Sequence, residues 1–308
     1  MDLNPFIEKV EKLGLKVEGV IVCKWDGEWP GALSEYACHR WIPESRRNVH
    51  SVSKSFTSVA VGMAIDEGKL KLSDRVTRVF PRGKSDTQAP VYTAANAGAL
   101  DSRWDALTLE HLLTMNMGHP VLSRPRTVRE AVSYELSRDP GTCFFYDNTC
   151  TFLASAMLTE ATGFKLRDYL LDRLFRPLGI SDPEWQESED GYTIGATGLS
   201  LTTSEMALFG RFLLQKGSWE GKQLVSASWI ERAARTQVST QPNRIPDYDL
   251  GYGYCFWMCR HGAYRCDGRD GQYIIVFPAL DAVVAINSNE ENQNPILWAV
   301  WDYILPQL

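Results

Sequence analysis

The segment NVHSVSKSFTSVAVGMAIDEGKL, residues 48–70, puts a hydroxyl and an amine at the start of a helix that is apolar on nearly every side. Residues three apart on a helix have Cβ atoms about 5–6 Å apart, so Ser51 and Lys54 share a face of the first turn. Backbone N–H groups there lack partners inside the helix and lie at the positive end of its dipole. The segment therefore offers a nucleophile, a proton acceptor and an oxyanion donor, which are the groups that acyl transfer requires.

The same two residues also have a simpler interpretation. Ser51 could act only as the N-cap of the helix, with the Lys54 side chain extended to water. A catalytic role instead needs a buried Lys54, because removal from water lowers the pKa of an amine and makes it a base near neutral pH. The spacing alone leaves both interpretations open.

A second candidate motif is Tyr146-x-Asn148 in FFYDNTCTFLASAMLTEATG, where it precedes a segment with helical spacing. No other Tyr-x-Asn occurs in the chain. A phenol can relay a proton, and a carboxamide can hold an amine by hydrogen bonds.

With these residues and their flanks, the chain resembles the serine β-lactamase and penicillin-binding protein superfamily, most closely the class C β-lactamase-like serine hydrolases and esterases. HSVSKSFTS is similar to the nucleophile helix of that family, and FYDNTCTFLASAMLTEATGFKLRDYLLDRLFRPLGI to its block from Tyr-x-Asn to Pro-Leu-Gly. Three more segments follow the family's order: LTLEHLLTMNMGH, TGLSLTTSEMALFGRFLLQKGSWEGKQLVSASWI and GQYIIVFPALDAVVAI. The resemblance covers residues 15 to 305, roughly.

The resemblance implies a metal-independent serine hydrolase without a cofactor. Ser51 would be the acylated nucleophile and Lys54 its proton partner. Tyr146 would carry the proton to the leaving group and activate the deacylating water, while Asn148 would hold Lys54 and the substrate by hydrogen bonds. A free tyrosine is only about 0.1% phenolate at pH 7, and a neighbouring Lys54 cation is expected to lower the pKa of Tyr146. The sequence leaves open which of the two holds the proton vacancy.

The family's third motif, Lys-Thr-Gly or His-x-Gly, corresponds by position to Cys266-Asp267-Gly268 in YRCDGRDGQY. Gly268 is retained, and the resemblance makes the N–H of Arg269 a second oxyanion donor beside that of Ser51. A thiol and an acid replace the usual cation, so a carboxylate-bearing β-lactam or D-alanyl peptide would face Asp267. We therefore expect small esters or amides as substrates. Four residues could restore a positive site, although an ordinary strand or turn role is favoured for each: Arg260, His261, Arg265 and Arg269.

Other functions stay open beside this one. The altered third motif also fits a penicillin-binding or sensor-type module that acylates without efficient turnover, or a true β-lactamase or D-aminopeptidase. A Gly-x-Ser-x-Gly nucleophile elbow is absent. His50 adjoins Ser51, but a residue preceding the nucleophile points elsewhere, so we interpret it as local structure. Aromatic residues near the third motif are interpreted as strand packing in preference to a pocket: Tyr252, Tyr254 and Trp257.

The composition limits the partners. A net charge of −6 argues against nucleic acid, and short basic segments such as RPR are interpreted as solvated loops. The first 16 residues are amphipathic, without the apolar region of a signal peptide, and no apolar run is long enough to cross a bilayer. We expect a cytoplasmic protein, without a membrane partner, whose ligand is a small ester, amide or peptide-like molecule. The oligomeric state is not specified by the sequence.

Seven cysteines without an export signal argue against a disulfide framework. The group Cys255, Cys259, His261 and Cys266 resembles a metal site. If GYGYCFWMCR is a strand, however, Cys255 and Cys259 lie about 13 Å apart, whereas two thiolates on one zinc lie about 4 Å apart. Buried, apolar cysteines are therefore the favoured interpretation.

The elements that must position these residues change type along the chain. The chain opens with a segment of helical spacing, which is followed by predicted strands in VEGVIVCK and ACHRWIPES. Near its other end, a last predicted helix follows strands in GYGYCFWMCR, AYRCDG, QYIIVF and DAVVAINS. Between them the pattern is mostly helical, with caps such as Thr202 and Gly163. We expect an α/β fold of the α+β type: one domain, residues 1–308, whose antiparallel sheet is flanked by helices. Its sheet lobe would comprise residues 1–80 and 250–308, and its inserted helical lobe residues 81–249.

Overall fold

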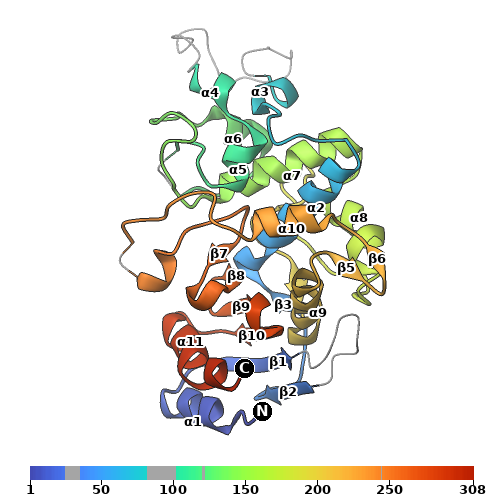
Figure 1. Ribbon diagram of the computed structural model, residues 1–308. Coiled ribbons are helices and arrows are strands. Elements are labelled where there is room, and N and C mark those ends of the chain that lie inside the picture. The colour runs from blue at the N-terminus through green and yellow to red at the C-terminus, as the bar shows by residue number, and fades with distance from the viewer. Residues whose placement is uncertain (25–34, 82–101, 120–121, 244) are drawn as a thin grey trace.

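The computed structural model describes residues 1–24, 35–81, 102–119, 122–243 and 245–308. Its centre is a six-stranded antiparallel sheet assembled from both ends of the chain (Figure 1). The strands lie in the order β2-β1-β10-β9-β8-β7. They are β1 (Val17–Lys24), β2 (Glu35–Arg40), β7 (Trp257–Met258), β8 (Tyr264–Gly268), β9 (Gln272–Phe277) and β10 (Ala282–Ser288). The predicted fold class is confirmed.

The two faces of the sheet are covered by different helices because strand side chains alternate. Along β10, Val284 and Ile286 face the terminal helices α1 (Asn4–Lys12) and α11 (Asn294–Ala299). Val283 and Ala285 face the larger core that contains α2 (Ser53–Asp66) and α9 (Thr203–Leu214). The sheet is thus one layer of three, with the site helix α2 on its inner side (Figure 1).

The remaining helices lie mostly beyond α2, in the upper half of Figure 1. They are α3 (Val76–Val79), α4 (Arg103–Ala106), α5 (Leu109–Leu113), α6 (Val128–Ser133), α7 (Asn148–Thr162), α8 (Leu166–Leu170) and α10 (Ala227–Ala233). Two short ribbons complete the fold: β3 (Arg47–Asn48) with β4 (Ser200–Leu201), and β5 (Ser218–Trp219) with β6 (Lys222–Gln223). Although α9 falls in the range predicted for the helical lobe, it packs on the sheet, where Gly210 allows a close approach to Val283 and Ile274.

Several predicted helix ends are confirmed by their caps. Thr202 accepts from the N–H of Glu205, whose side chain accepts in return from Thr202 N–H, and so forms a capping box at the start of α9. Gly163 closes α7 with a left-handed backbone, φ 76°. At α5 the box pairs Thr108 with His111.

The strand predicted for GYGYCFWMCR is mostly wrong. Only Trp257–Met258 pairs with β8, and Cys255 adopts a left-handed backbone, φ 63°. The N–H groups of Tyr254 and Cys255 instead donate to the carbonyls of Ala233 and Leu113. The segment therefore connects the sheet to the helices, so the strand spacing used for Cys255 and Cys259 does not apply.

All seven cysteines, each among the described residues, are free thiols. Within the same described part of the chain, no three His, Cys, Asp or Glu side chains gather as metal ligands would. A search of the described helices finds none with both the length and the apolar character needed to span a bilayer.

Candidate active site

The nucleophile candidate lies in a short 3-10 turn, η1 (His50–Val52), that leads directly into α2. The N-cap position of α2 is Val52, and no side chain caps the helix. The interpretation of Ser51 as an N-cap is therefore wrong. Ser51 is half-buried, so its hydroxyl is held in place but remains reachable.

Lys54 is almost fully buried, with 1% of its surface exposed. Its Nζ lies 3.0 Å from Ser51 Oγ, 2.7 Å from Asn148 Oδ1 and 2.7 Å from the carbonyl oxygen of Ala196. The alternative in which Lys54 extends to water is therefore wrong. Twelve residues of α2, Ser53 to Ala64, are buried, so the helix leaves its first-turn lysine no path to solvent.

Burial lowers the pKa of Lys54 to about 7, and the nearby Cys255 and Asp147 oppose this shift. A neutral amine has two N–H donors and one lone pair. The oxygens of Asn148 and Ala196 can only accept, so they take the two N–H groups. The lone pair is then left for the Ser51 hydroxyl, which is the arrangement of a general base and its nucleophile.

Tyr146 and Asn148 reach the site from the start of α7. Asp147 caps this helix, since its carboxylate accepts from the N–H of Thr149 at 3.2 Å. Asn148 therefore begins the helix beside Lys54, and the Tyr146 ring centre lies 4.9 Å from Lys54 Nζ. The structure brings Ser51, Lys54, Tyr146 and Asn148 together.

The expected lowering of the Tyr146 pKa by Lys54 is wrong in direction. Burial raises the pKa of Tyr146 well above 10, and a hydrogen bond with Ser51 opposes the rise only in part. Tyr146 packs against two other rings, Trp257 at 5.5 Å and Tyr252 at 6.0 Å between centroids, which cover part of its surface. These directions place the proton vacancy on Lys54, with Tyr146 as a protonated phenol.

The third motif reaches the nucleophile through Gly268, the last residue of β8. A Cβ at this position would lie 2.4 Å from the carbonyl oxygen of Val49, so only glycine lets the strand end pack against the turn that carries Ser51. Arg269 follows directly, with its side chain 61% exposed. The role of its N–H as an oxyanion donor stays a prediction.

The other two residues of that motif point to opposite faces of β8. Cys266 is fully buried in the larger core, which also contains α2, and burial raises the pKa of its thiol. The Asp267 carboxylate accepts from Arg265 Nε at 2.8 Å, and Arg265 is fully buried. The acid expected to face a substrate carboxylate thus has its charge compensated within the protein.

The four residues considered as replacement cations lie in different places. Arg265 pairs with Asp267, and Arg260 pairs with Asp247 at 2.9 Å. His261 is exposed in a turn. Only Arg269 lies beside the nucleophile turn, because it follows Gly268.

Of the three aromatic residues interpreted as packing, two contact the site. Tyr252 and Trp257 pack on Tyr146, and both are buried. Tyr254 instead stacks on Trp229, with centroids 5.4 Å apart. The rings of Tyr252 and Trp257 therefore hold the Tyr146 side chain in position.

Two site groups were missed by the sequence reasoning. One is the carbonyl of Ala196, a backbone atom that no side-chain pattern reveals. It reaches Lys54 because the adjacent Gly195 is squeezed between α2 and α7, where a Cβ would lie 2.8 Å from Thr57 Oγ1 and from the carbonyl oxygen of Thr151.

The second missed group is Arg124, in the RPR segment interpreted as a solvated loop. The preceding residue, Ser123, donates from N and Oγ to Asp147 Oδ1, both at 3.0 Å, and so holds the loop against the start of α7. The exposed Arg124 guanidinium contributes to the lowering of the Lys54 pKa and of the His50 pKa. The sequence showed the basic residues of RPR, but it could not show which residues lie near them in the folded chain.

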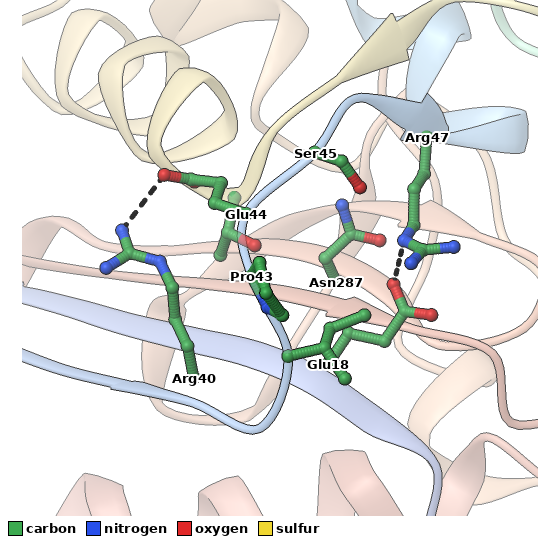
Figure 2. A pocket seen from close by; sticks show the side chains of 9 residues that line it. Glu18, Arg40, Pro43, Glu44, Ser45, Arg47 and Asn287 are labelled. Atoms are coloured by element: carbon green, nitrogen blue, oxygen red, sulfur yellow. Dashed lines mark ion pairs between the residues drawn. The ribbon is translucent and has the colours of Figure 1, made fainter.

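A separate polar crevice, shown in Figure 2, lies beside the segment that enters the nucleophile turn. None of the four clustered site residues lines it. Its charges are paired with each other, Arg47 with Glu18 and Arg40 with Glu44 (Figure 2). We interpret it as a structural contact that fixes β3.

Comparison with known proteins agrees with the fold. The family model described as Beta-lactamase matches residues 20–306. The chain therefore belongs to the β-lactamase family.

Individual relatives are distant. A 6-aminohexanoate-dimer hydrolase from Paenarthrobacter ureafaciens is 26% identical over 82% of this chain and 68% of its own length. A lovastatin esterase from Penicillium rubens is 23% identical over 55% of this chain, and the match spans 49%, about half, of that relative. A penicillin-binding protein homologue from Pyrococcus abyssi has the same fold, with a TM-score of 0.75, 19% identity and coverage of 100% of this chain and 78% of that one.

The burial of Lys54 makes a prediction about stability. Its pKa is about 7 in the folded chain, against an ordinary value near 10.4 when unfolded. Between these values the unfolded chain binds more protons, so the wild type gains stability as pH rises. Compared with Lys54→Met, we expect the wild type to gain up to ~1.4 kcal/mol of unfolding free energy per pH unit between pH 8 and 9.5.

Urea unfolding at several pH values measures this slope. The difference in unfolding free energy between wild type and Lys54→Met at a single pH does not test the pKa, because the methionine also leaves Asn148 and Ala196 without their hydrogen-bond donor. Lys69→Met, at an exposed position just past α2, is the control. Parallel stability curves for wild type and Lys54→Met would contradict a depressed pKa.

Arg124 makes a second prediction. Removing its positive charge takes away one of the causes that lower the Lys54 pKa, so Arg124→Gln is expected to raise that pKa. NMR titration of protein labelled with ¹³Cε-lysine measures the Lys54 signal directly. Arg126→Gln is the matched control, since Arg126 is exposed in the same segment and pairs with Glu189 at 3.1 Å. An unchanged or lowered pKa in Arg124→Gln would show that this charge is not felt at the site.

Proposed function

We propose that this chain is a serine hydrolase that forms an acyl-enzyme on Ser51 and acts on small esters or amides. The observation that carries the proposal is the buried Lys54 amine, with a pKa near 7 and 3.0 Å from the Ser51 hydroxyl. Membership of the β-lactamase family and relatives named as an esterase and a dimer hydrolase support it.

Acylation uses the groups in a fixed order. Ser51 Oγ attacks the acyl carbonyl carbon while its proton moves to the lone pair of Lys54. Charge develops on the carbonyl oxygen, which the N–H groups of Ser51 and Arg269 would stabilise. The protonated phenol of Tyr146 then gives its proton to the leaving alcohol or amine and recovers one from Lys54.

Deacylation reverses these roles. A water molecule takes the place of the leaving group and gives its proton through Tyr146 to Lys54, and Ser51 leaves with a proton as the acid is released. Asn148 and Ala196 keep the Lys54 nitrogen aligned in both steps, since each accepts one of its N–H groups. Apart from the attacking water, each step of the proposed mechanism is assigned to a side chain or backbone group of this chain.

The substrate class is part of the proposal. With Asp267 paired to Arg265, the charge expected to repel carboxylate substrates is compensated. Esters and small amides remain our choice, because the residue at the position of the family's cation is a buried thiol, Cys266, that faces the core.

Mutation of the nucleophile tests the proposal. Wild-type protein exposed to short-chain p-nitrophenyl esters, anilides and β-lactams should gain an acyl mass that maps to Ser51, and should turn over at least one ester or anilide. Ser51→Ala should lose the adduct and at least ~10³-fold in rate. Ser58→Ala is the control, since Ser58 is a buried serine one turn beyond Lys54 on the same helix.

The outcomes separate the functions. Turnover by Ser51→Ala at the wild-type rate contradicts the proposed nucleophile. A stable adduct on Ser51 without turnover would favour a penicillin-binding or sensor-type module, and turnover confined to β-lactams would indicate a β-lactamase.

The dependence of rate on pH gives a second test. Lys54 acts as a base only when neutral, and its pKa is about 7. For an uncharged ester, kcat/KM is therefore expected to rise with pH through about 7 and to level off above it. Circular dichroism at each pH confirms that the fold persists. A profile that is flat from pH 5 to 9, or one that falls across this range, is incompatible with Lys54 as the base.

A further inference from the structure

The turn between β8 and β9, residues 269–271, contacts the nucleophile turn through a side chain that the mechanism above does not use. Asp270 Oδ2 lies 3.3 Å from His50 Nε2, and the same oxygen accepts from Arg269 Nε at 3.3 Å. His50 directly precedes Ser51 in the chain. One carboxylate oxygen thus contacts His50, the neighbour of the predicted donor Ser51, and Arg269, whose N–H is the other predicted donor.

We propose that Asp270 is a positioning residue that ties His50 to Arg269 and so fixes the separation of the Ser51 and Arg269 N–H groups. The inference rests on the proposed function and deepens it, because it concerns the oxyanion site of the same reaction. His50, interpreted from the sequence as local structure, becomes the second half of this tie.

The backbone supports the tie. His50 and Asp270 both have left-handed backbones, with φ of 48° and 64°. Side chains other than glycine seldom adopt this region, and they persist there when the surrounding contacts require it. Two such residues facing each other across 3.3 Å indicate that each turn is held in its shape to make this contact.

The contact is also sheltered. The side chains of His50 and Asp270 are 22% and 16% exposed, whereas that of Arg269 is 61% exposed. A pair partly removed from water is less screened than a surface pair. Burial and the Arg269 charge lower the pKa of His50, so the imidazole is neutral at pH 7 and can donate one N–H to the carboxylate.

The β8–β9 turn has anchors that do not involve His50. The Asp270 carbonyl accepts from Glu290 N–H at 3.0 Å, and Gly271 N–H donates to Gln293 Oε1 at 3.3 Å. Removing the Asp270 carboxylate should therefore leave the turn folded. It should loosen only the contact between this turn and the nucleophile turn, near the place where Gly268 packs against Val49.

Glycine substitutions test the tie without disturbing the backbone, because glycine adopts positive φ freely. Asp270→Gly and His50→Gly should each lower kcat for a p-nitrophenyl ester about 10-fold, with KM unchanged. Removing an oxyanion donor outright costs about 10²–10³-fold, and here the donor is displaced but present. The effect falls on kcat because the oxyanion contact forms in the transition state.

The double variant gives the sharper result. If both residues act through one contact, His50→Gly combined with Asp270→Gly should be no slower than either single variant. Asp270→Asn, which keeps an acceptor and tolerates a left-handed backbone, should retain most of the wild-type kcat. Asp281→Gly is the matched control: Asp281 also has positive φ, 48°, lies exposed in the β9–β10 turn, and should leave kcat unchanged.

The inference is overturned if Asp270→Gly and His50→Gly keep the wild-type kcat, or if their losses multiply in the double variant. Thermal melts and the Ser51 adduct mass identify any variant that fails to fold, and the remaining single variant with Asp270→Asn then decides. If Ser51→Ala is inactive and these variants are unaffected, only the tie is wrong. If Ser51→Ala is fully active, the proposed function is wrong, and the tie, which rests on it, is wrong as well.

Discussion

The site depends on an amine kept away from water by the same helix that carries it. Lys54 is 1% exposed, and a charged amine is costly to bury, so the position is tolerable only because oxygen atoms surround the nitrogen and because the group can shed its proton. Two of those oxygens can only accept hydrogen bonds, which leaves the Ser51 hydroxyl as the one partner able to donate. The hydrogen bonds to Asn148 and Ala196 thus make the burial of Lys54 tolerable and also leave its lone pair directed at the Ser51 hydroxyl.

The rest of the fold serves to bring those oxygens to one point. Asn148 comes from the first turn of α7, the Ala196 carbonyl from a segment closed against both helices by Gly195, and Ser51 from the turn before α2. The sheet contributes from the other side, where Gly268 allows the end of β8 to meet Val49. Four segments separated widely in sequence therefore meet at the site, and each reaches it through a glycine or the start of a helix.

Two carboxylates near the site, Asp267 and Asp270, have cationic partners. Asp267 is paired with the buried Arg265, and Asp270 is paired with Arg269 and also contacts the neutral His50. Among the described residues, no ion pair is seen for Arg124, although its charge is felt at Lys54 and at His50. The Arg124 cation favours the neutral form of Lys54.

The sequence by itself determined the elements and the identity of the chemical groups. Short apolar runs in QYIIVF and DAVVAINS predicted β9 and β10, and local caps at Thr202 and Gly163 set helix ends, because these signals depend on neighbours a few residues away. Ser51 with Lys54 and Tyr146 with Asn148 were visible as short local motifs, and the resemblance of the surrounding segments to a known family gave them their expected roles. Only the tertiary structure decided the distances between the motifs, the direction in which the Tyr146 pKa moves, the departure of residues 251–256 from a strand, and the contacts of Ala196, Arg124 and Asp270. Those properties arise from burial and from contacts between segments far apart in the chain, and no local pattern of residues records them.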